Sequence, residues 1–378
     1  MKISENWLRT WVNPAVDSNT LSDQLTMLGL EVDDLSPAAK PFTGVVVGEV
    51  LTVEQHPDAD RLRVTTVNIG SGEPLQIVCG APNVRVGMKA PVATIGAVLP
   101  GDFKIKKGKL RGIESQGMLC GASEIDLEDK IDGLLELPVD APVGVDIREY
   151  LQLDDHVIDI SITPNRGDCF SIRGIAREIG VINQLTVTAP EINAVAATIV
   201  DEKKVVVSTE GCPRYLGRVI KNVNTKAATP EWMERALVRS GIRQHSILVD
   251  ITNYVLMELG QPLHAFDAAK IQGSVQVRQA NTAEKLVLLN EQEVELNEKV
   301  MVIADDEKAL AIAGIMGGLS SSVTDETQDI FLESAFFAPL AIAGRARSFG
   351  LHTDASQRYE RGVDFELPML AMHRASQL

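Results

Sequence analysis

Residues 18–29 show the first regular pattern along the chain, because leucine recurs there at the spacing of one helical face. Ser18 or Asn19 is suited to cap the start of this helix, and Gly29 is suited to the left-handed position that ends it. The segment therefore predicts a short amphipathic helix near the start of the chain.

A different pattern follows Pro37 and Pro41, which interrupt the chain and mark a boundary. Between residues 42 and 148, short apolar strands recur roughly every ten to fifteen residues, with Gly or Pro at nearly every junction. Short strands at even spacing are typical of a small closed or partly closed barrel. A five-stranded oligonucleotide-binding barrel (OB-fold) is the architecture that fits best.

Strand alternation returns at residues 158–162, and Asp168 is suited to cap the helix that follows the next turn. Residues 1–38 are too few to bury a core of their own. We therefore expect 1–38 and 151–190 to fold together as a small N-terminal α+β module. The barrel, residues 39–150, would be inserted between these two segments.

The last part of the chain, residues 205–378, mixes strands and helices. Thr229 and Pro230 have the order expected at a helix start, with Thr229 as the cap and Pro230 as the first helical residue. A second helix over 246–259 is expected to end at Gly260. The predicted fold is thus a multidomain α+β chain in which an α+β domain follows the inserted barrel.

The composition indicates a globular protein, since 45% of the 378 residues are hydrophobic and 23% are charged. A net charge of −16 argues against nonspecific binding to DNA or to an anionic membrane. The longest apolar run, residues 309–319, is too short to span a bilayer, and the N-terminus lacks the apolar core of a signal peptide. We therefore expect no membrane insertion and a cytoplasmic location. Four widely spaced cysteines predict reduced, buried thiols and no metal site: Cys79, Cys120, Cys169 and Cys212.

Five cations lie within eight residues of the expected barrel: Lys104, Lys106, Lys107, Lys109 and Arg111. A local basic patch of this kind favours nucleic-acid phosphates despite the acidic chain, but strand alternation divides it between two faces unless a bulge intervenes. An ordinary solvated hairpin is an equally good interpretation. In the HPDADRL string at 56–62, the proline favours a tight turn over a metal site.

The densest cluster of polar and glycine residues lies between 311 and 362. Glu333 stands where the apolar run of a strand is expected to end, and Thr353 lies in a turn that enters a helix. The simpler interpretations are a glutamate that caps a helix or pairs with an arginine, and a threonine that caps a helix. Gly317 and Gly318 permit either a plain turn or a close approach of the backbone to a ligand.

Two further polar residues precede this cluster. His264 lies in a proline-containing loop between a helix end and a strand, a setting where functional side chains gather, although a lone histidine is more often structural. Arg243 follows the glycine that ends a helix and is also consistent with a surface cation. The chain contains no GxSxG, HExxH or Walker A string, and GIMGG at 314–318 lacks the spacing of a dinucleotide fingerprint.

Longer strings along nearly the whole chain are more specific. They are GLEVDDL at 29–35, HPDADRL at 56–62, IVCGAPNV at 77–84, GMLCGASEI at 117–125, TPNRGDCFSIRGIAREI at 163–179, ELGQPLHAFD at 258–267, GIMGG at 314–318, LESAFF at 332–337 and TDASQRYERGVD at 353–364. In this order they resemble the N-terminal half of the β subunit of bacterial phenylalanine–tRNA ligases. Two departures, Gly121 where many relatives have Ser and Tyr359 where Phe is frequent, are minor.

The resemblance implies that residues 39–150 are an OB-fold tRNA-binding domain and that residues 205–378 are an editing domain. Such a domain hydrolyses tyrosine wrongly esterified to phenylalanine tRNA, tRNA(Phe). In the family, the partner α subunit performs aminoacylation within an α2β2 heterotetramer, and the ligands for ATP and Mg²⁺ lie outside the region that matches this chain. No cofactor is therefore expected here, and a chain that stops at Leu378 within a helical pattern is expected to be truncated. The alternative is a non-catalytic scaffold that docks tRNA and assembles the synthetase.

The resemblance also implies one pocket made from distant parts of the chain. Glu333 would recognise the tyrosyl hydroxyl, His264 would orient the attacking water or contact the terminal adenosine, and Thr353 would position the water or the ester. The remaining members, which cradle the ester, line the pocket or lie near the substrate, are Gly317, Gly318, Ala355 and Arg243.

A separate editing pocket has a physical reason that does not depend on the resemblance. A hydrophobic pocket shaped for phenylalanine rejects the extra hydroxyl of tyrosine by only roughly 10²-fold. A pocket that hydrogen-bonds the hydroxyl discriminates the other way by up to about 10⁴–10⁵, because phenylalanine leaves the buried polar group unpaired.

Overall fold

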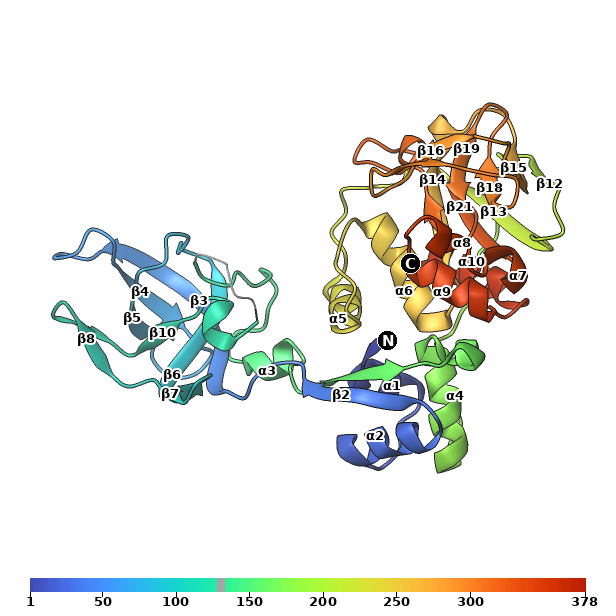
Figure 1. Cartoon of the computed structure of the whole chain (residues 1–378). Coiled ribbons are helices and arrows are strands. Elements are labelled where there is room, and N and C mark those ends of the chain that lie inside the picture. The colour runs from blue at the N-terminus through green and yellow to red at the C-terminus, as the bar shows by residue number, and fades with distance from the viewer. Residues whose placement is uncertain (128–132) are drawn as a thin grey trace. The chain divides into compact units, whose positions relative to one another are not determined.

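The computed structural model describes residues 1–127 and 133–378, which form two compact units. One unit comprises Met1–Leu35 with Val157–Leu378, and the other comprises Ser36–His156. Figure 1 shows the order of elements within each unit by colour. None of the described helices is long and apolar enough to cross a membrane.

The unit of residues 36–156 is built on a curled antiparallel sheet with the strand order β10-β6-β3-β4-β5. The strand β7 pairs with β6, and β8 and β9 form a separate hairpin. The bounds are β3 Thr43–Gln55, β4 Arg63–Asn68, β5 Leu75–Cys79, β6 Lys89–Leu99, β7 Phe103–Lys104, β8 Gly108–Leu110, β9 Ile113–Ser115, β10 Gly117–Leu119 and the short helix α3 Ile147–Tyr150. The strands expected between 42 and 148 are therefore confirmed.

The two edges of this sheet approach each other. The backbone N–H of Gln116, just before β10, donates to the carbonyl of Gln76 in β5 at 2.8 Å, and Val78 donates to the Ser115 hydroxyl at 3.1 Å. The apolar residues of this unit form two clusters, one that contains Val47 and one that contains Val92. The sheet is thus a curled half-barrel in which β9 and β10 bridge toward β5.

The other unit begins with a three-stranded sheet of order β1-β11-β2 and three helices. The bounds are β1 Lys2–Ser4, α1 Glu5–Trp11, α2 Ser18–Met27, β2 Glu31–Pro37, β11 His156–Ser161 and α4 Ile172–Asn183. Its apolar core continues into the helices α5 Glu231–Arg239, α6 Ile247–Leu259 and α10 Leu367–Gln377. Trp7 stacks on Tyr254 of α6 with ring centroids 4.7 Å apart. The small N-terminal module therefore shares one core with the domain that follows it.

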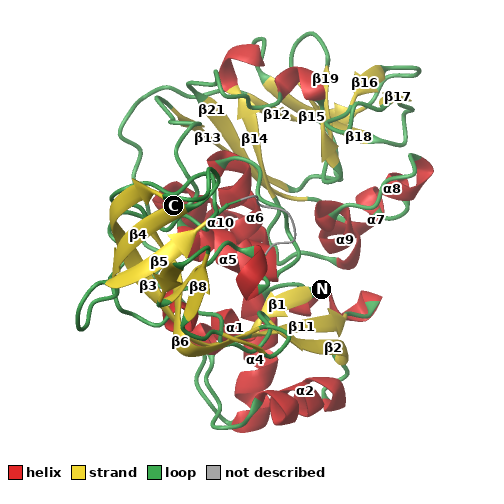
Figure 2. Ribbon diagram, turned by 90° about the vertical axis from the view of Figure 1, so that its left-hand side faces the viewer, coloured by secondary structure: helices red, strands yellow, loops and turns green. Residues whose placement is uncertain are grey.

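Two sheets form the rest of this unit. A three-stranded sheet has the order β13-β21-β14, and a five-stranded sheet has the order β12-β15-β18-β19-β20, with the β16–β17 hairpin near β19 and β20 (Figure 2). The bounds are β12 Val205–Val207, β13 Arg214–Ile220, β14 Leu263–Asp267, β15 Val275–Gln279, β16 Lys285–Val287, β17 Glu293–Glu295, β18 Met301–Ala304, β19 Ala309–Ile312, β20 Met316–Gly317, β21 Ile330–Phe336, α7 Pro339–Ile342, α8 Arg345–Ser348 and α9 Asp354–Arg361.

The strand β21 separates two apolar cores, because successive side chains of a strand point to opposite faces. Ile330 and Leu332 pack with α6 and α10, whereas Phe331 and Ala335 pack with the five-stranded sheet. Glu333 has the same parity as Phe331 and Ala335. Its carboxylate therefore lies on the face that turns toward the five-stranded sheet.

Several expected helix caps differ in the structure. Asp17, and not Ser18 or Asn19, caps α2, and Ser171, and not Asp168, caps α4. Thr229 does not cap α5, because its hydroxyl donates to Asp250 Oδ2 at 2.6 Å, which leaves Pro230 at the cap position. In contrast, the expected helix over 246–259 is confirmed, and Gly260 ends it with φ of +87°.

Candidate functional site

The register of the three-stranded sheet places two candidate residues directly opposite each other. His264, the second residue of β14, pairs with Glu333 at the centre of β21. On its other side Glu333 faces Gly217 of β13, a residue without a side chain. Neighbouring residues of an antiparallel pair project from the same face, so the imidazole and the carboxylate lie side by side on the sheet.

A cavity of about 70 Å³ lies over these two side chains. The strands β18 to β20, the turn between β19 and β20, and α9 supply its other walls. Its lining is otherwise largely apolar and comprises Pro262, Leu263, Ile303, Ala311, Ile312, Ala313, Gly314, Ile315, Met316, Gly317, Ala355 and Tyr359. The cavity thus combines one carboxylate and one imidazole with a surround that is aliphatic except for Tyr359.

Glu333 is buried, with 6% of its surface exposed. Tyr215 of β13 donates its phenolic hydrogen to Glu333 Oε2 at 2.7 Å. Burial raises the pKa of Glu333 to about 7, because a carboxylate loses its hydration in an apolar site, while the bond from Tyr215 opposes the change. Near neutral pH the carboxyl group is therefore close to the midpoint between its protonated and ionised forms.

The imidazole of His264 packs edge-on against Phe266, with ring centroids 4.4 Å apart. Its Nε2 is enclosed and has no hydrogen-bond partner among the described residues. Burial lowers the pKa of His264 to about 4, because the protonated ring would lose its hydration in the enclosed site. At neutral pH the ring is therefore neutral, with one ring nitrogen that a water or ligand would satisfy.

Gly317 makes room for this imidazole. A Cβ atom at Gly317 would lie 2.5 Å from His264 Cε1 and 2.7 Å from Nε2, closer than side-chain atoms pack. Gly317 was expected to permit the close approach of a ligand. In the structure it permits the close approach of the His264 side chain.

Gly317→Ala is expected to destabilise the fold by about 2 kcal/mol, because the imidazole must leave its position. Urea unfolding of the single variant and of the variant that also carries His264→Ala would measure this. Since His264→Ala removes the clashing ring, the glycine substitution should cost less than half as much in the double variant. Equal costs in both backgrounds would show that the imidazole does not occupy this space.

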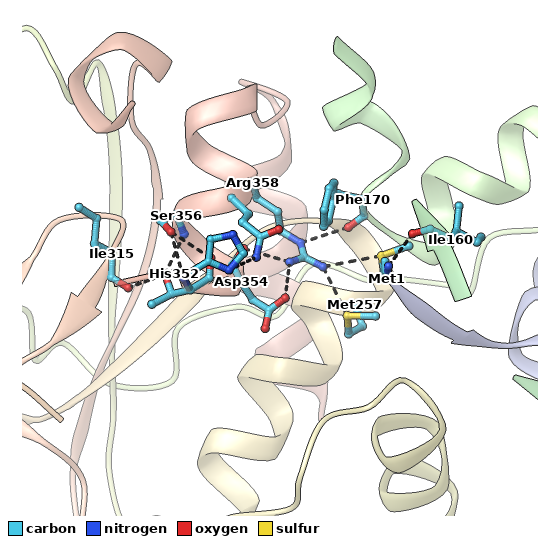
Figure 3. A network of polar contacts seen from close by, with 11 residues as sticks. Met1, Ile160, Phe170, Met257, Ile315, His352, Asp354, Ser356 and Arg358 are labelled. Carbon is cyan, nitrogen blue, oxygen red and sulfur yellow. Dashed lines mark hydrogen bonds and ion pairs between the residues drawn. The ribbon is translucent and has the colours of Figure 1, made fainter. Parts of the chain in front are cut away.

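Thr353 caps α9. Its hydroxyl accepts from the Ser356 N–H at 3.1 Å, the Ser356 hydroxyl accepts from the Thr353 N–H at 3.2 Å, and Thr353 donates to the carbonyl of Ile315 at 2.9 Å. Figure 3 shows Ile315 and Ser356 in this network. The helix-cap interpretation is confirmed, and the hydroxyl also fixes α9, with Ala355, to the cavity wall at Ile315.

Thr353→Ala should lower the free energy of unfolding by about 1 kcal/mol, the usual cost of removing a helix cap. Thr353→Ser keeps the hydroxyl and should restore most of that stability. Urea denaturation of the three proteins tests this expectation, and a serine variant as unstable as the alanine variant would contradict the capping role.

Two other candidates lie differently. The N–H of Gly318 donates to the Leu310 carbonyl at 2.7 Å, and a Cβ at Gly318 would meet that carbonyl, so Gly318 serves close strand packing and does not line the cavity. Arg243 is exposed in the loop before α6, whereas His264 follows the other end of that helix. The thirteen residues of α6 extend about 20 Å, so Arg243 is not brought to the cavity.

Sequence reasoning missed two tyrosines of the site, and the expectation that Tyr359 lies outside the pocket is wrong, because it lines the cavity. Tyr215 holds Glu333, and the hydroxyl of Tyr359 donates to the Ala335 carbonyl at 3.0 Å and accepts from Gln261 at 3.1 Å. Tyr215 lies 118 residues from Glu333 along the chain, and the strand register brings the two side chains together.

Glu333 should leave a signature in the pH dependence of stability. A carboxyl whose pKa is near 4.5 when unfolded and about 7 when folded binds more protons in the folded state between these values, so it lowers stability as pH rises from 4.5 to 7. His264, with its lowered pKa, acts in the opposite sense and lowers stability as pH falls from 6.5 to 4. Between pH 4.5 and 6.5 the two effects largely cancel in the native protein.

Glu333→Gln should uncover this balance. As the pH rises from 4.5 to 7.5, the free energy of unfolding of the variant should increase by about 3 kcal/mol relative to that of the native protein. Urea unfolding at the two pH values measures the change, and Glu326→Gln, at a side chain that is 88% exposed, is the matched control. An identical pH profile for Glu333→Gln and native protein would contradict the buried, raised-pKa carboxyl.

One cluster of possible metal ligands occurs among the described residues. Asp168, Cys169 and Glu178 place their ligand atoms within 4.8 Å of one another. The guanidinium of Arg166 occupies this cluster, with ion pairs of 3.1 Å to Asp168 and 3.0 Å to Glu178. Burial raises the pKa of the Cys169 thiol to about 12, so it remains protonated. These groups fit an arginine better than a metal ion.

The cationic segment of the barrel unit borders a second cavity, of about 500 Å³. Lys104 and Lys106 line it together with Phe103, which is 58% exposed. Lys107 makes an ion pair with Glu114 at 2.7 Å, while Lys109 and Arg111 lie exposed on the β8–β9 hairpin and its turn. The turn expected at HPDADRL is present, and both ring nitrogens of His56 are hydrogen-bonded within the unit.

Comparisons with known proteins match both units. Residues 45–146 match the family model of a putative tRNA binding domain, and residues 211–378 match the B3/4 domain. The chain is 82% identical over 378 residues to the phenylalanine–tRNA ligase beta subunit of Acinetobacter baylyi and 66% identical over 385 residues to that of Psychrobacter arcticus. Each match covers 100% of this chain and 48% of the relative, so the chain spans about half the length of these relatives.

A solved structure is also similar, in part. It is the crystal structure of an N-terminal fragment of the phenylalanyl-tRNA synthetase beta-subunit from Pyrococcus horikoshii, at 16% identity and a TM-score of 0.28. The match covers 48% of this chain and 56% of that one.

Proposed function

The chain belongs to the family of phenylalanine–tRNA ligase beta subunits, and we propose that its residues 205–378 edit mischarged tRNA. The proposed reaction is hydrolysis of the ester that joins tyrosine to tRNA(Phe). Water adds to the ester carbonyl, the bond to the terminal ribose oxygen breaks, and free tyrosine and tRNA are released. Residues 1–38 with 151–190 are proposed as the module that supports this domain and the inserted barrel.

The observation that supports this proposal best is the pairing of Glu333 with His264 across two strands at one cavity. Glu333 is a buried acceptor that already binds one phenol, that of Tyr215, at 2.7 Å. A tyrosyl hydroxyl offers a second donor of the same kind, whereas a phenylalanyl ring would bury the carboxyl without adding a donor to it. The site therefore has the chemistry to select the hydroxyl.

The hydrolytic step would use positioned groups and no bound metal ion. Neutral His264 has an enclosed Nε2 that would orient the attacking water, or contact the terminal adenosine, once a substrate is bound. Ala355 and the backbone at Gly317 would form the adjoining wall, and Thr353 would fix that wall through Ile315. We assign no dedicated general base.

The cavity must enlarge to admit a tyrosyl group. Its 70 Å³ is well below the roughly 300 Å³ at which small-molecule pockets begin. Met316 is half-buried in the lining, and an unbranched thioether adapts to a new surface at low cost. We propose that movement of Met316, at the edge strand β20, opens the site.

The barrel unit is proposed as an OB-fold tRNA-binding domain. Its exposed cations Lys104, Lys106, Lys107, Lys109 and Arg111 would contact phosphates, and Phe103 would stack on a base. The whole protein is proposed to act in the cytoplasm with an α subunit as an α2β2 heterotetramer. ATP and Mg²⁺ would bind outside this chain.

Release of tyrosine from Tyr-tRNA(Phe) by the purified chain tests the proposal. We expect release well above the spontaneous rate, with the folded state of the protein confirmed by circular dichroism. A scaffold that only docks tRNA would bind the same tRNA without accelerating release. That outcome, tRNA affinity with no hydrolysis, would reject editing by this chain.

A further inference from the structure

The unit that contains the His264–Glu333 cavity has another cavity, of about 430 Å³. The two cavities share no lining residue. The larger cavity lies where the turn at Pro164–Cys169, the start of α4, the end of α6 and the end of α9 meet. Its volume is in the range of small-molecule sites. Its charged lining consists of Arg173, Arg177, Arg358, Arg361, Asp168 and Asp364.

Arg358 is the structural member of this set. It is 1% exposed, and Figure 3 shows its guanidinium at the centre of a network with Phe170, Asp354 and Met257. It donates to the Phe170 carbonyl at 3.1 Å and to both the carbonyl and the carboxylate of Asp354. Its charge is thus already compensated, and it braces the wall of the cavity.

Arg173 and Arg177 stand one turn apart on α4, with Arg173 in the first turn of the helix. Like charges at this spacing repel, and a cation near a helix N-terminus opposes the helix dipole. Burial and the neighbouring Arg177 lower the pKa of Arg173, and the carboxylate of Asp364 is 4.0 Å away. Arg177 is exposed and donates to the Asp168 carbonyl at 3.3 Å, so Arg173 is the arginine of this pair that the protein alone stabilises poorly.

Arg361 reaches the cavity from the end of α9. Its guanidinium stacks on the Phe170 ring at 4.7 Å, and its Nη1 is buried without an acceptor in the described part of the chain. The other carboxylate of the lining, Asp168, is bound by Arg166 through two contacts of 3.1 and 3.2 Å. Three guanidiniums, those of Arg173, Arg177 and Arg361, therefore share the lining with the carboxylate of Asp364, which lies 4.0 Å from Arg173 and accepts from the Glu366 N–H at 2.9 Å.

We propose that this cavity binds a phosphate ester through Arg173, Arg177 and Arg361. A phosphate group carries up to two negative charges and offers several oxygens to guanidinium forks, which matches the excess of two positive charges. The cavity is larger than a phosphate ion needs, and Leu259, Val363 and Leu367 supply apolar walls for the organic part. Two sources have this chemistry, a free nucleotide and the backbone of tRNA. The inference does not rest on ester hydrolysis by the chain.

Binding of AMP and of inorganic phosphate to the whole chain, measured by isothermal titration at low salt, tests the proposal. We expect AMP to bind, and Arg173→Gln and Arg361→Gln each to weaken its binding about tenfold, as for loss of a charge-assisted hydrogen bond. Arg347→Gln, at an exposed arginine of α8 outside this lining, should bind AMP like the native protein. Thermal unfolding of each variant separates lost contacts from lost folding, and Arg173, whose side chain is 30% exposed, is the safer position.

The same variants distinguish the two sources. If the ligand is the tRNA backbone, Arg173→Gln and Arg361→Gln should weaken tRNA binding in a fluorescence anisotropy titration as they weaken AMP binding. If the ligand is a free nucleotide, Arg173→Gln and Arg361→Gln should bind tRNA as tightly as Arg347→Gln does. Absence of phosphate and AMP binding by the native chain, or equal affinities in all four proteins, would overturn the proposal.

Discussion

Glu333→Ala is expected to reduce the preference for tyrosyl over phenylalanyl ester about 100-fold, the effect of losing a hydrogen bond to a charged group. Among the described residues that line the cavity, Glu333 is the only one with a carboxylate, and its bond from the Tyr215 phenol shows that it accepts from an aromatic hydroxyl. Single-turnover hydrolysis of the two esters of tRNA(Phe) gives the preference directly. Glu333→Gln, which keeps a neutral acceptor, should show an intermediate loss.

The pH dependence of the preference adds a check. Because the pKa of Glu333 is raised to about 7, the ionised acceptor accumulates above that pH, and the preference of the native protein should rise across it. The rise should disappear in Glu333→Gln. A preference that is unchanged in Glu333→Ala would remove Glu333 from hydroxyl recognition.

His264→Ala is expected to slow hydrolysis of the tyrosyl ester by about 100-fold, as typical for loss of a group that positions a reacting water. The imidazole is neutral at physiological pH, and its Nε2 is enclosed without a partner. If His264 orients water, the rate at saturating tRNA should fall. If it contacts the terminal adenosine, the concentration of tRNA needed for half the maximal rate should rise instead.

The matched control for this substitution is His352→Ala. His352 is exposed before α9, and its ring contacts Gln357 outside the cavity. The His352→Ala variant should hydrolyse the ester at the native rate. A His264→Ala variant that is folded and equally active would exclude a role for the imidazole.

The fold could be predicted largely from local signals. The end of α6 at Gly260 and the strands of the barrel depend on residues a few positions apart, and they lie where expected. The cap at Thr229 was predicted wrongly because its hydroxyl bonds Asp250, 21 residues away, and no local pattern reports that competition. Sequence signals therefore predict the periodic elements correctly. They fail where a side chain bonds a residue that is distant in the sequence.

In the candidate site, too, some features could be predicted from the sequence and others depend on distant partners. Glu333 was expected at the end of a strand, yet β21 continues to Phe336, because Ser334 and Ala335 pair with β13. The pairing places Glu333 in the middle of the sheet, opposite His264, and gives it Tyr215 as a partner. The resemblance named Glu333 and His264, but their environment, the raised and lowered pKa values included, follows from tertiary packing alone.

The most direct test is a structure of this chain bound to a non-hydrolysable tyrosyl-adenosine. We expect an enlarged cavity with Met316 displaced, the phenolic oxygen about 2.7 Å from the Glu333 carboxylate, and the amide that replaces the ester beside His264. An analogue bound elsewhere, with the 70 Å³ cavity unchanged, would contradict the assignment of this site.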